Sequence, residues 1–201
     1  MTVPEAPERE PSPVVQGMIV VGVLAAVMWV VEIVDQVAGG SLDSNGIEPR
    51  EADGLDGILW APFLHANWDH LIGNTIPFVL LGIGIALSGA ARVILVTAIV
   101  AVIGGLGTWL IGPPNTVHIG ASGLVFGSAA YLVSRGAFTR RPLQIVLGVV
   151  VVAVRGATLL QGLVPEDGIS WQGHLFGAIG GVVAAWLLEH RTRQRRPAAT
   201  V

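Results

Sequence analysis

Apolar residues gather in six long stretches along the chain, separated by short polar connections that contain proline, glycine or arginine. The first stretch covers residues 14 to about 38, and the others follow at about 66–87, 93–111, 119–134, 143–164 and 170–188. About 20 apolar residues in a helix cross the hydrocarbon core of a bilayer. The pattern therefore predicts an all-α membrane protein, a bundle of six transmembrane helices in which some spans are interrupted by glycine and polar residues.

Three polar segments fall outside the apolar stretches. Residues 1–13 alternate proline with acidic residues and offer little to bury, so we expect a disordered cytoplasmic tail rather than a signal peptide. Residues 39–63 form a charged insertion that ends in the apolar run LWAPFL, and we expect an external loop lying partly on the membrane surface. Residues 191–201 form a basic tail at the cytoplasmic leaflet, with no nucleic-acid partner. The six-helix membrane domain is thus expected to cover residues 14–190.

Composition supports the membrane class. The mean hydropathy is +0.69 and only 12% of the residues are charged, whereas soluble proteins average about 25%. Glycine accounts for 27 of 201 residues, which in apolar segments favours close packing of helices. The absence of cysteine excludes disulfides, zinc–thiolate sites and thiol nucleophiles.

The arginines of the connections fall on one side of the membrane if both ends of the chain lie there. They are Arg92, Arg135, Arg140, Arg141, Arg191, Arg193, Arg195 and Arg196. The opposite side carries Arg50 among many acidic residues. Because arginine-rich short loops stay in the cytoplasm, we expect both termini to be cytoplasmic. The exclusive use of Arg over Lys is typical of a GC-rich genome, and we expect an integral protein of a bacterial plasma membrane.

Four polar residues lie near the starts of the second, fourth and sixth spans, which all run inward from the outer side. They are His70, Asn74, Ser122 and His174. Polar groups inside spans are costly and indicate function. At 1.5 Å of rise per residue, these four lie at similar depth and can converge on one site.

The residue types at these positions fit acyl transfer. His70 and Asn74 are four residues apart, which places both on one helical face. Ser122 follows Gly120 at a junction of loop and helix, where free backbone N–H groups are available. His174 is the candidate base for the Ser122 hydroxyl, because imidazole titrates near neutral pH. The pattern predicts a Ser122–His174 pair, called the dyad below.

The order and spacing of these residues resemble the rhomboid intramembrane proteases over about residues 57–188. The HxxxxHxxxN motif is matched by His65, His70 and Asn74, and the serine motif GxSG by Gly120, Ser122 and Gly123. The last-span motif HxxGxxxG is matched by His174, Gly177 and Gly181.

The resemblance implies a six-span rhomboid fold and a cofactor-free, metal-free serine endopeptidase. Ser122 would be the nucleophile and His174 the general base. The side chains of His70 and Asn74, with the Ser122 N–H, would form the oxyanion hole, and His65 would support it. The implied substrates are single-span transmembrane proteins, cut near the outer end of their helix, within the membrane lipid.

Physical reasoning adds to the resemblance. The tetrahedral intermediate of peptide hydrolysis is an anion, which buried donors such as His70 and Asn74 stabilise strongly where water is excluded. Gly177 and Gly181 would let the sixth span approach the serine-bearing fourth span closely. A bulky residue at either position should therefore separate Ser122 from His174.

The chain also departs from the family pattern. Many members carry a Trp-Arg pair in the first external loop, eight or nine residues before the first motif histidine, where this chain has Asp56 and Gly57. The usual anchoring of that loop is therefore not expected here, whereas the catalytic set is unaffected.

Three further ionisable residues carry less weight. His118, four residues before Ser122, is interpreted as facing the loop and is left out of the site. Asp167 is interpreted as part of a solvated turn rather than as a third member of a triad. Arg155, within a span, either reaches outward to the interface or pairs with a carboxylate such as Glu32.

Other functions remain open at this level. A rhomboid-like pseudoenzyme would bind transmembrane helices without cutting them, although Ser122 and His174 are intact. A small transporter or channel would line a pathway with polar residues, yet these gather at one depth. A metal site from His65, His70 and His174 lacks an HExxH motif and a carboxylate ligand.

Overall fold

The computed structural model describes residues 10–166 and 168–194. Of the tails expected at residues 1–13 and 191–201, residues 1–9 and 195–201 lie outside the described residues, as does Asp167, whereas α1 already begins at Pro13 and α7 continues to Gln194. Within the described part the chain is wholly helical, apart from loops and one isolated β-bridge. The α-helices are α1 (Pro13–Val37), α2 (Gly57–Trp60), α3 (Trp68–Ala86), α4 (Ala90–Ile111), α5 (Ser122–Thr139), α6 (Pro142–Gln161) and α7 (Trp171–Gln194). The short 3₁₀ turns are η1 (Leu42–Asn45), η2 (Ala52–Gly54) and η3 (Ala61–Phe63).

Local sequence signals explain several helix ends. The Ser12 side chain accepts a hydrogen bond from the Val15 N–H and Pro13 opens α1, where a missing N–H costs nothing. The Asn67 side chain caps α3 in the same way. Gly89, with φ of +92°, makes the sharp turn from α3 to α4, a conformation that a residue with a Cβ rarely adopts.

In the part of the chain that the structure describes, five helices are long and apolar enough to cross a membrane: α1, α3, α4, α6 and the part of α7 up to His190. The protein is therefore an all-helical membrane protein. The remaining predicted span, residues 119–134, corresponds to α5, which starts later and carries Ser122, Ser128 and Arg135. Its lower hydropathy has a structural reason, because α5 is largely buried among other helices.

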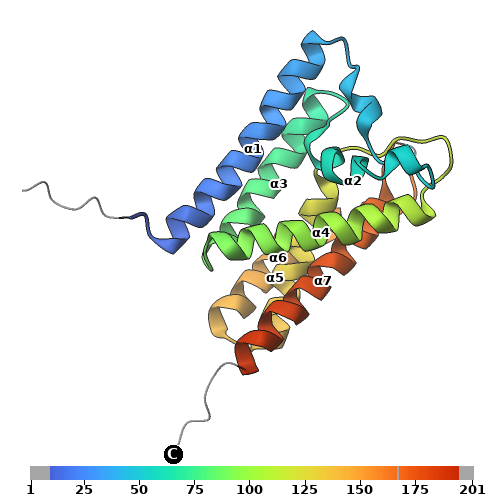
Figure 1. The fold of residues 1–201 in the computed structure, drawn as a ribbon. Helices are drawn as coiled ribbons and strands as arrows, with labels where there is room; N and C mark the ends of the chain where they lie inside the picture. Colours follow the sequence, from blue (N-terminus) through green and yellow to red (C-terminus); the bar gives the residue numbers. More distant parts are fainter. Residues whose placement is uncertain (1–9, 167, 195–201) are drawn as a thin grey trace, which may run out of the picture.

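The helices pack around α5, which contacts α3, α4, α6 and α7. Helix α1 lies beside α3, and α4 crosses between them and α7 (Figure 1). The core contains Leu71, Val100, Leu124 and Tyr131, all almost fully buried. This arrangement brings the N-terminal ends of α3, α5 and α7, where the predicted site residues lie, to one end of the bundle.

The outer faces of the peripheral helices are apolar. On α6 the side chains of Val154 and Leu160 are 70% and 71% exposed, and α1 presents a similar row that includes Val23 and Val30. An apolar surface of this extent is unfavourable in water but is solvated by lipid chains. The exposed faces of α1 and α6 therefore fit direct contact with the bilayer.

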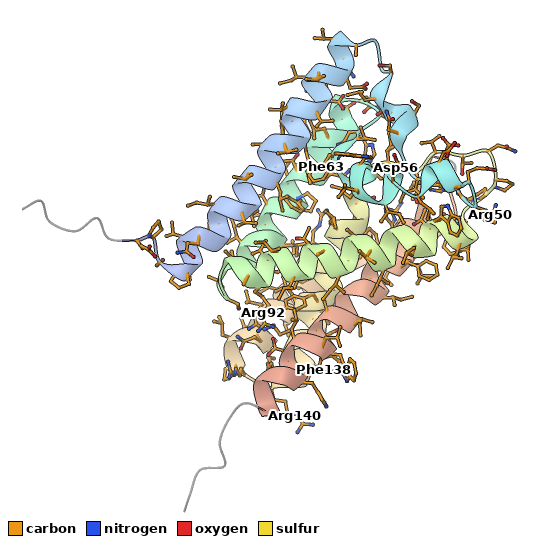
Figure 2. All side chains as sticks on the ribbon, viewed as in Figure 1. Arg50, Asp56, Phe63, Arg92, Phe138 and Arg140 are labelled. Carbon is orange, nitrogen blue, oxygen red and sulfur yellow. The ribbon has the colours of Figure 1, made fainter. Side chains whose placement is uncertain are left out.

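A buried ionic cluster joins three helices at the end of the bundle opposite the predicted site. Glu189 of α7 accepts from Arg92 of α4 at 2.7 Å and pairs with Arg135 of α5 at 3.0 Å. The start of α1 is close to the same end, because Pro13 lies against Gly89. Figure 2 shows Arg92 and Arg140 at this end and Arg50 at the other.

Arg155 forms no ion pair with Glu32. Among the described residues, the ion pairs are those of Glu189 with Arg92 and with Arg135. Arg155 is half-buried on α6, and its Nε atom has no hydrogen-bond partner. Of the two alternatives predicted for this arginine, pairing with Glu32 is therefore wrong.

The loop of residues 39–63 is folded onto the ends of the helices. Ile47 forms an antiparallel bridge with His118, with N–O distances of 3.0 and 2.9 Å. The Arg50 guanidinium donates to the carbonyls of Leu110 and Gly112 at 3.2 and 2.7 Å. These contacts anchor the loop to the end of α4 without the Trp-Arg pair that the resemblance led us to look for at Asp56 and Gly57.

Gly57 stands where many members of the resembled family have arginine, and the packing around it requires glycine. A Cβ added to Gly57 would collide with the Gly46 carbonyl, which is backbone and cannot rotate away. The indole of Trp109 adds a further anchor, since its Nε1–H donates to the Glu51 carbonyl at 2.8 Å. The loop is thus held through a different set of residues.

Candidate active site

Ser122 is the first residue of α5, and Gly120 creates the turn that places it there. Gly120 has a φ of +109°, and its N–H donates to the Ala61 carbonyl at 2.8 Å. A Cβ at this position would lie 2.6 Å from the His70 ring. Both the backbone conformation and the available space therefore require glycine.

The Ser122 hydroxyl and the His174 imidazole meet across α5 and α7. Ser122 Oγ lies 2.8 Å from His174 Nε2, and His174 Nδ1 lies 2.6 Å from the Gly162 carbonyl oxygen. Because a carbonyl only accepts, Nδ1 carries the ring hydrogen and Nε2 is left to accept from the Ser122 hydroxyl. The Phe126 ring stacks on the imidazole, with centroids 4.0 Å apart and an angle of 3°.

The orientation of the His174 imidazole is set by a backbone carbonyl, that of Gly162, among the residues that the structure describes. Asp167, the alternative third member of a triad, lies outside the described residues, and the backbone carbonyl of Gly162 fixes the imidazole tautomer. An uncharged acceptor avoids placing a further carboxylate in the apolar surroundings of His174. The pair thus joins a hydroxyl donor to an imidazole acceptor whose tautomer is fixed.

Glycines bring α5 and α7 into backbone contact next to this pair. A Cβ on Gly177 would collide with the Gly123 carbonyl, and one on Gly181 would collide with the Gly127 carbonyl. The predicted close approach of these two helices at Gly177 and Gly181 is present. Any larger residue there would push the helix that carries His174 away from the one that carries Ser122.

His70 and Asn74 face Gly120 from α3. A Cβ on Gly120 would lie 2.7 Å from His70 Nε2 and 3.5 Å from Asn74 Nδ2. His70 Nδ1 accepts from the Ala66 N–H at 3.4 Å, so the ring hydrogen is on Nε2. Two donors therefore converge beside the backbone that leads into Ser122.

These four side chains line one open cavity of about 1110 Å³. The cavity lies between residues 113–119 and residues 165–166 and 168–174, at the end of the bundle that carries Arg50. A cavity of this size admits an extended peptide segment together with water. The predicted nucleophile, base and donors thus share one accessible space.

His65 contacts the backbone segment that precedes Ser122. Its side chain is 1% exposed, and its Nε2 accepts from the Ala121 N–H at 3.4 Å. The ring also packs edge-on against His70, with centroids 5.1 Å apart. Burial, with a smaller contribution from His70, lowers the pKa of His65 to about 4, so the ring is neutral and can accept at neutral pH.

Two more residues, His118 and Ser170, line the same cavity. His118 Nδ1 lies 2.7 Å from Ser170 Oγ, and His118 Nε2 lies 3.0 Å from Thr116 Oγ1. His118 does face the loop, because Thr116 and Ser170 both lie outside the helices, and it also lines the cavity. A signal was available, because His118 and Ser170 each stand four residues before a member of the dyad.

No metal centre is evident in the part of the chain that the structure describes, since no three His, Asp or Glu side chains come together as donors there. His65, His70 and His174 are instead engaged separately, with the Ala121 N–H, the Ala66 N–H and the Gly162 carbonyl. Each imidazole has a hydrogen-bond partner that fits a neutral ring.

Comparison with known proteins adds independent information. A family model for the rhomboid domain matches residues 54–191. An uncharacterized protein of Mycobacterium tuberculosis is 50% identical over 180 residues, which cover 85% of this chain and 75% of that protein. An uncharacterized protein of Mycobacterium leprae is 47% identical over 196 residues, which cover 92% of this chain and 77% of that protein.

A more distant bacterial relative has a functional name. YdcA of Bacillus subtilis, which is provisionally named a rhomboid protease, is 28% identical over 133 residues, covering 66% of each chain. The matched residues of the family model include all the site residues described above.

Proposed function

Because the chain belongs to the rhomboid family, we propose that it is an intramembrane serine endopeptidase that works through the dyad of Ser122 and His174. The observation that carries this proposal is the 2.8 Å contact between Ser122 Oγ and His174 Nε2 in an open cavity, with His174 Nδ1 engaged by the Gly162 carbonyl. The provisional name of the Bacillus relative agrees with this class of activity.

The proposed reaction has two steps. His174 Nε2 removes the proton of the Ser122 hydroxyl as Oγ attacks the peptide carbonyl carbon, and the Nδ1 hydrogen bond to Gly162 stabilises the resulting imidazolium. His174 then gives its proton to the leaving amine, which yields an acyl-enzyme. Water activated by the same imidazole hydrolyses the acyl-enzyme and restores Ser122.

The negative charge of each tetrahedral intermediate needs donors on the oxygen. His70 Nε2–H and the Asn74 amide lie beside Gly120, and the Ser122 backbone N–H is free because Ser122 opens α5. We assign these three donors to the oxyanion hole. Gly120 leaves room for the His70 and Asn74 side chains, Gly123 lets the Gly173 backbone of α7 approach, and His65 keeps the adjoining backbone in place.

The proposal includes a topology and a substrate class. We take α5 as a sixth transmembrane helix, with both termini and the cluster around Glu189 on the cytoplasmic side and residues 39–63 outside. The protein then lies in a bacterial plasma membrane, in contact with its lipids. Its substrates are single-span membrane proteins that unwind near their outer end, where the cavity opens.

The test compares cleavage of a single-span reporter in proteoliposomes by wild-type protein and by Ser122→Ala, His174→Ala and the double variant. We expect each single substitution to abolish cleavage with an unchanged melting temperature, and the double variant to be no worse, because nucleophile and base act as one unit. Ser128→Ala is the matched control, since Ser128 is a buried serine of α5 outside the cavity.

A fluorophosphonate probe and a chelator separate the alternatives. Wild-type protein should be labelled at Ser122, and a chelator should leave cleavage unchanged. Substantial cleavage by Ser122→Ala would contradict the serine mechanism. Loss of cleavage by wild-type protein on adding chelator would contradict it as well. Absence of cleavage and of labelling in folded wild-type protein would favour the pseudoenzyme.

A further inference from the structure

A second Ser–His contact lies next to the dyad, between the residues that come four positions before Ser122 and His174 in the sequence. The dyad joins Ser122 to His174, and the second contact joins His118 to Ser170. Each member of the second pair stands four residues before a member of the first, with the two residue types exchanged. Both contacts are short, at 2.7 Å for His118 Nδ1–Ser170 Oγ and 2.8 Å for the dyad.

We propose that His118 and Ser170 form a positioning clasp, which locks residues 112–121 to the start of α7 and so aligns Ser122 with His174. The inference rests on the proposed function, because it assigns these residues to the alignment of that dyad. Neither residue of the clasp reacts with substrate.

The hydrogen-bond partners fix the direction of every bond in the clasp. The Thr116 hydroxyl donates to the Pro113 carbonyl at 2.7 Å, so its oxygen accepts from His118 Nε2–H. His118 Nδ1 must then accept, and it accepts from the Ser170 hydroxyl. The Ser170 oxygen in turn accepts from the Gly173 N–H at 3.3 Å.

These hydrogen-bond partners are compatible with one state of His118, a neutral ring with its hydrogen on Nε2. Burial lowers the pKa of His118, which agrees with a neutral ring at physiological pH. A hydrogen on Nδ1 instead would remove the acceptor of the Ser170 hydroxyl. The clasp is therefore a directed chain that runs from the first turn of α7 to the turn after α4.

His118 is also tied to a third segment. Its backbone N–H and carbonyl pair with Ile47 of the external loop, while Ser170 caps the first turn of α7. The clasp thus connects residues 39–63, residues 112–121 and α7 directly above the dyad. A shift of about 1 Å between a nucleophile and its base can cost about 100-fold in rate, so this alignment has a large effect on turnover.

The main variants separate the hydrogen bonds from the packing. His118→Phe keeps a ring and removes both side-chain bonds, whereas His118→Gln retains one acceptor and one donor at a similar spacing. We expect His118→Phe and Ser170→Ala to lower kcat by about 10- to 100-fold with little change in KM. His118→Gln and Ser170→Thr, which keep the bonding groups, should stay within about threefold of wild type.

Trp109→Phe is the matched control. It removes the hydrogen bond of Trp109 to Glu51, which anchors the same external loop but does not reach α7. The clasp predicts a kcat near wild type for this variant. A wild-type kcat in His118→Phe, or an equal loss in Trp109→Phe that follows the melting temperature, would overturn the proposal.

A readout independent of activity uses ¹⁵N-labelled histidine in the Ser122→Ala background. The His118 resonances should report a neutral ring protonated on Nε2, and Ser170→Ala should shift the Nδ1 signal. The other tautomer would overturn the clasp while leaving the serine mechanism intact. Fluorophosphonate labelling at Ser170 would also overturn it, because Ser170 would then be a nucleophile. Cleavage that survives Ser122→Ala is the separate failure of the proposed function.

Discussion

Asn74 is the residue whose side chain best tests the oxyanion hole, because it faces Gly120 together with His70 and is 7% exposed. If its amide donates to the oxyanion, Asn74→Ala should lower kcat by about 10- to 1000-fold, the usual cost of one such donor. Substrate binding should change much less. Steady-state kinetics on the reporter measure both quantities.

The alternative role for Asn74 is a packing contact. Asn74→Asp keeps the shape and places a negative charge against the developing oxyanion, so it should be at least as damaging as alanine. Thr75→Val is the control on the same helix, since the Thr75 hydroxyl bonds the Leu71 carbonyl and Trp29 instead. A folded Asn74→Asp protein with near wild-type turnover at neutral pH would remove Asn74 from the site.

Asp43 gives the molecule a pH dependence of defined sign. Partial burial, together with the carboxyls of Asp35 and Glu32, raises the pKa of Asp43 to about 6 from its ordinary 3.8. A carboxyl with a raised pKa stabilises the folded state while protonated, and that contribution is lost as the pH rises through about 6. The loop that contains η1 should therefore be held more firmly in mild acid.

The melting temperature of wild-type protein and of Asp43→Asn checks this expectation. The asparagine variant should match wild type below pH 3.8 and exceed it increasingly up to about pH 6, with a constant advantage above. Asp53→Asn, an exposed neighbour on η2, should give no such difference. A constant offset between wild type and Asp43→Asn at every pH would contradict the assigned cause.

The residues with motif spacing could be predicted from the sequence, and those that act through contacts across the fold could not. His70, Asn74, Ser122 and His174 lie at the starts of spans, so orientation alone brings them to one depth. His118 and Ser170 are 52 residues apart in loops, and each is ordinary in its own segment. Their pairing depends on how the loops fold, which hydropathy does not encode.

At the scale of helices, each apolar stretch of the sequence corresponds to a helix in the predicted order, five of these helices are long and apolar enough to span a membrane in the described part of the chain, and some boundaries were misjudged. Residue 119 was expected inside the fourth span, whereas α5 starts at Ser122, because Gly120 adopts a positive φ. The loop at residues 39–63 contains the short elements η1, η2, α2 and η3. Each of them is too short to produce a repeating pattern of apolar residues in the sequence.

Gly181 tests the contact between α5 and α7. A Cβ at this position would meet the Gly127 carbonyl and would lie 2.9 Å from the Tyr131 N atom, all of it backbone. We expect Gly181→Ala to destabilise the protein by about 1–3 kcal/mol, the usual cost of overpacking, and to lower the rate of Ser122 labelling. Thermal unfolding and fluorophosphonate kinetics measure these two effects.

The control for this prediction is Gly22→Ala on α1, where an added Cβ has nothing within 4 Å. That substitution should be neutral or stabilising, because alanine is the better helix former by about 1 kcal/mol. If both variants behave alike, the glycines of α7 are not needed for the approach of the two helices.

At the scale of the whole molecule, the arginines define an orientation that labelling can check. The natural chain has no cysteine, so single substitutions report their own position. Ser44→Cys, exposed in η1, should react with an impermeant maleimide in intact cells, whereas Arg141→Cys, between α5 and α6, should react only after permeabilisation. The reverse result would overturn the proposed orientation and place the cavity on the cytoplasmic side.

The contact of Gly177 and Gly181 with the backbone of α5 has a consequence for the surrounding bilayer. A membrane that is thicker or thinner than the apolar stretch of a helix tilts or strains that helix at modest energetic cost. Here the spacing between the segments that carry Ser122 and His174 is limited by main-chain atoms that cannot rearrange. The intrinsic reactivity of the serine should therefore stay the same in short-chain and long-chain lipids, so that membranes of different thickness alter only how readily a substrate helix reaches it.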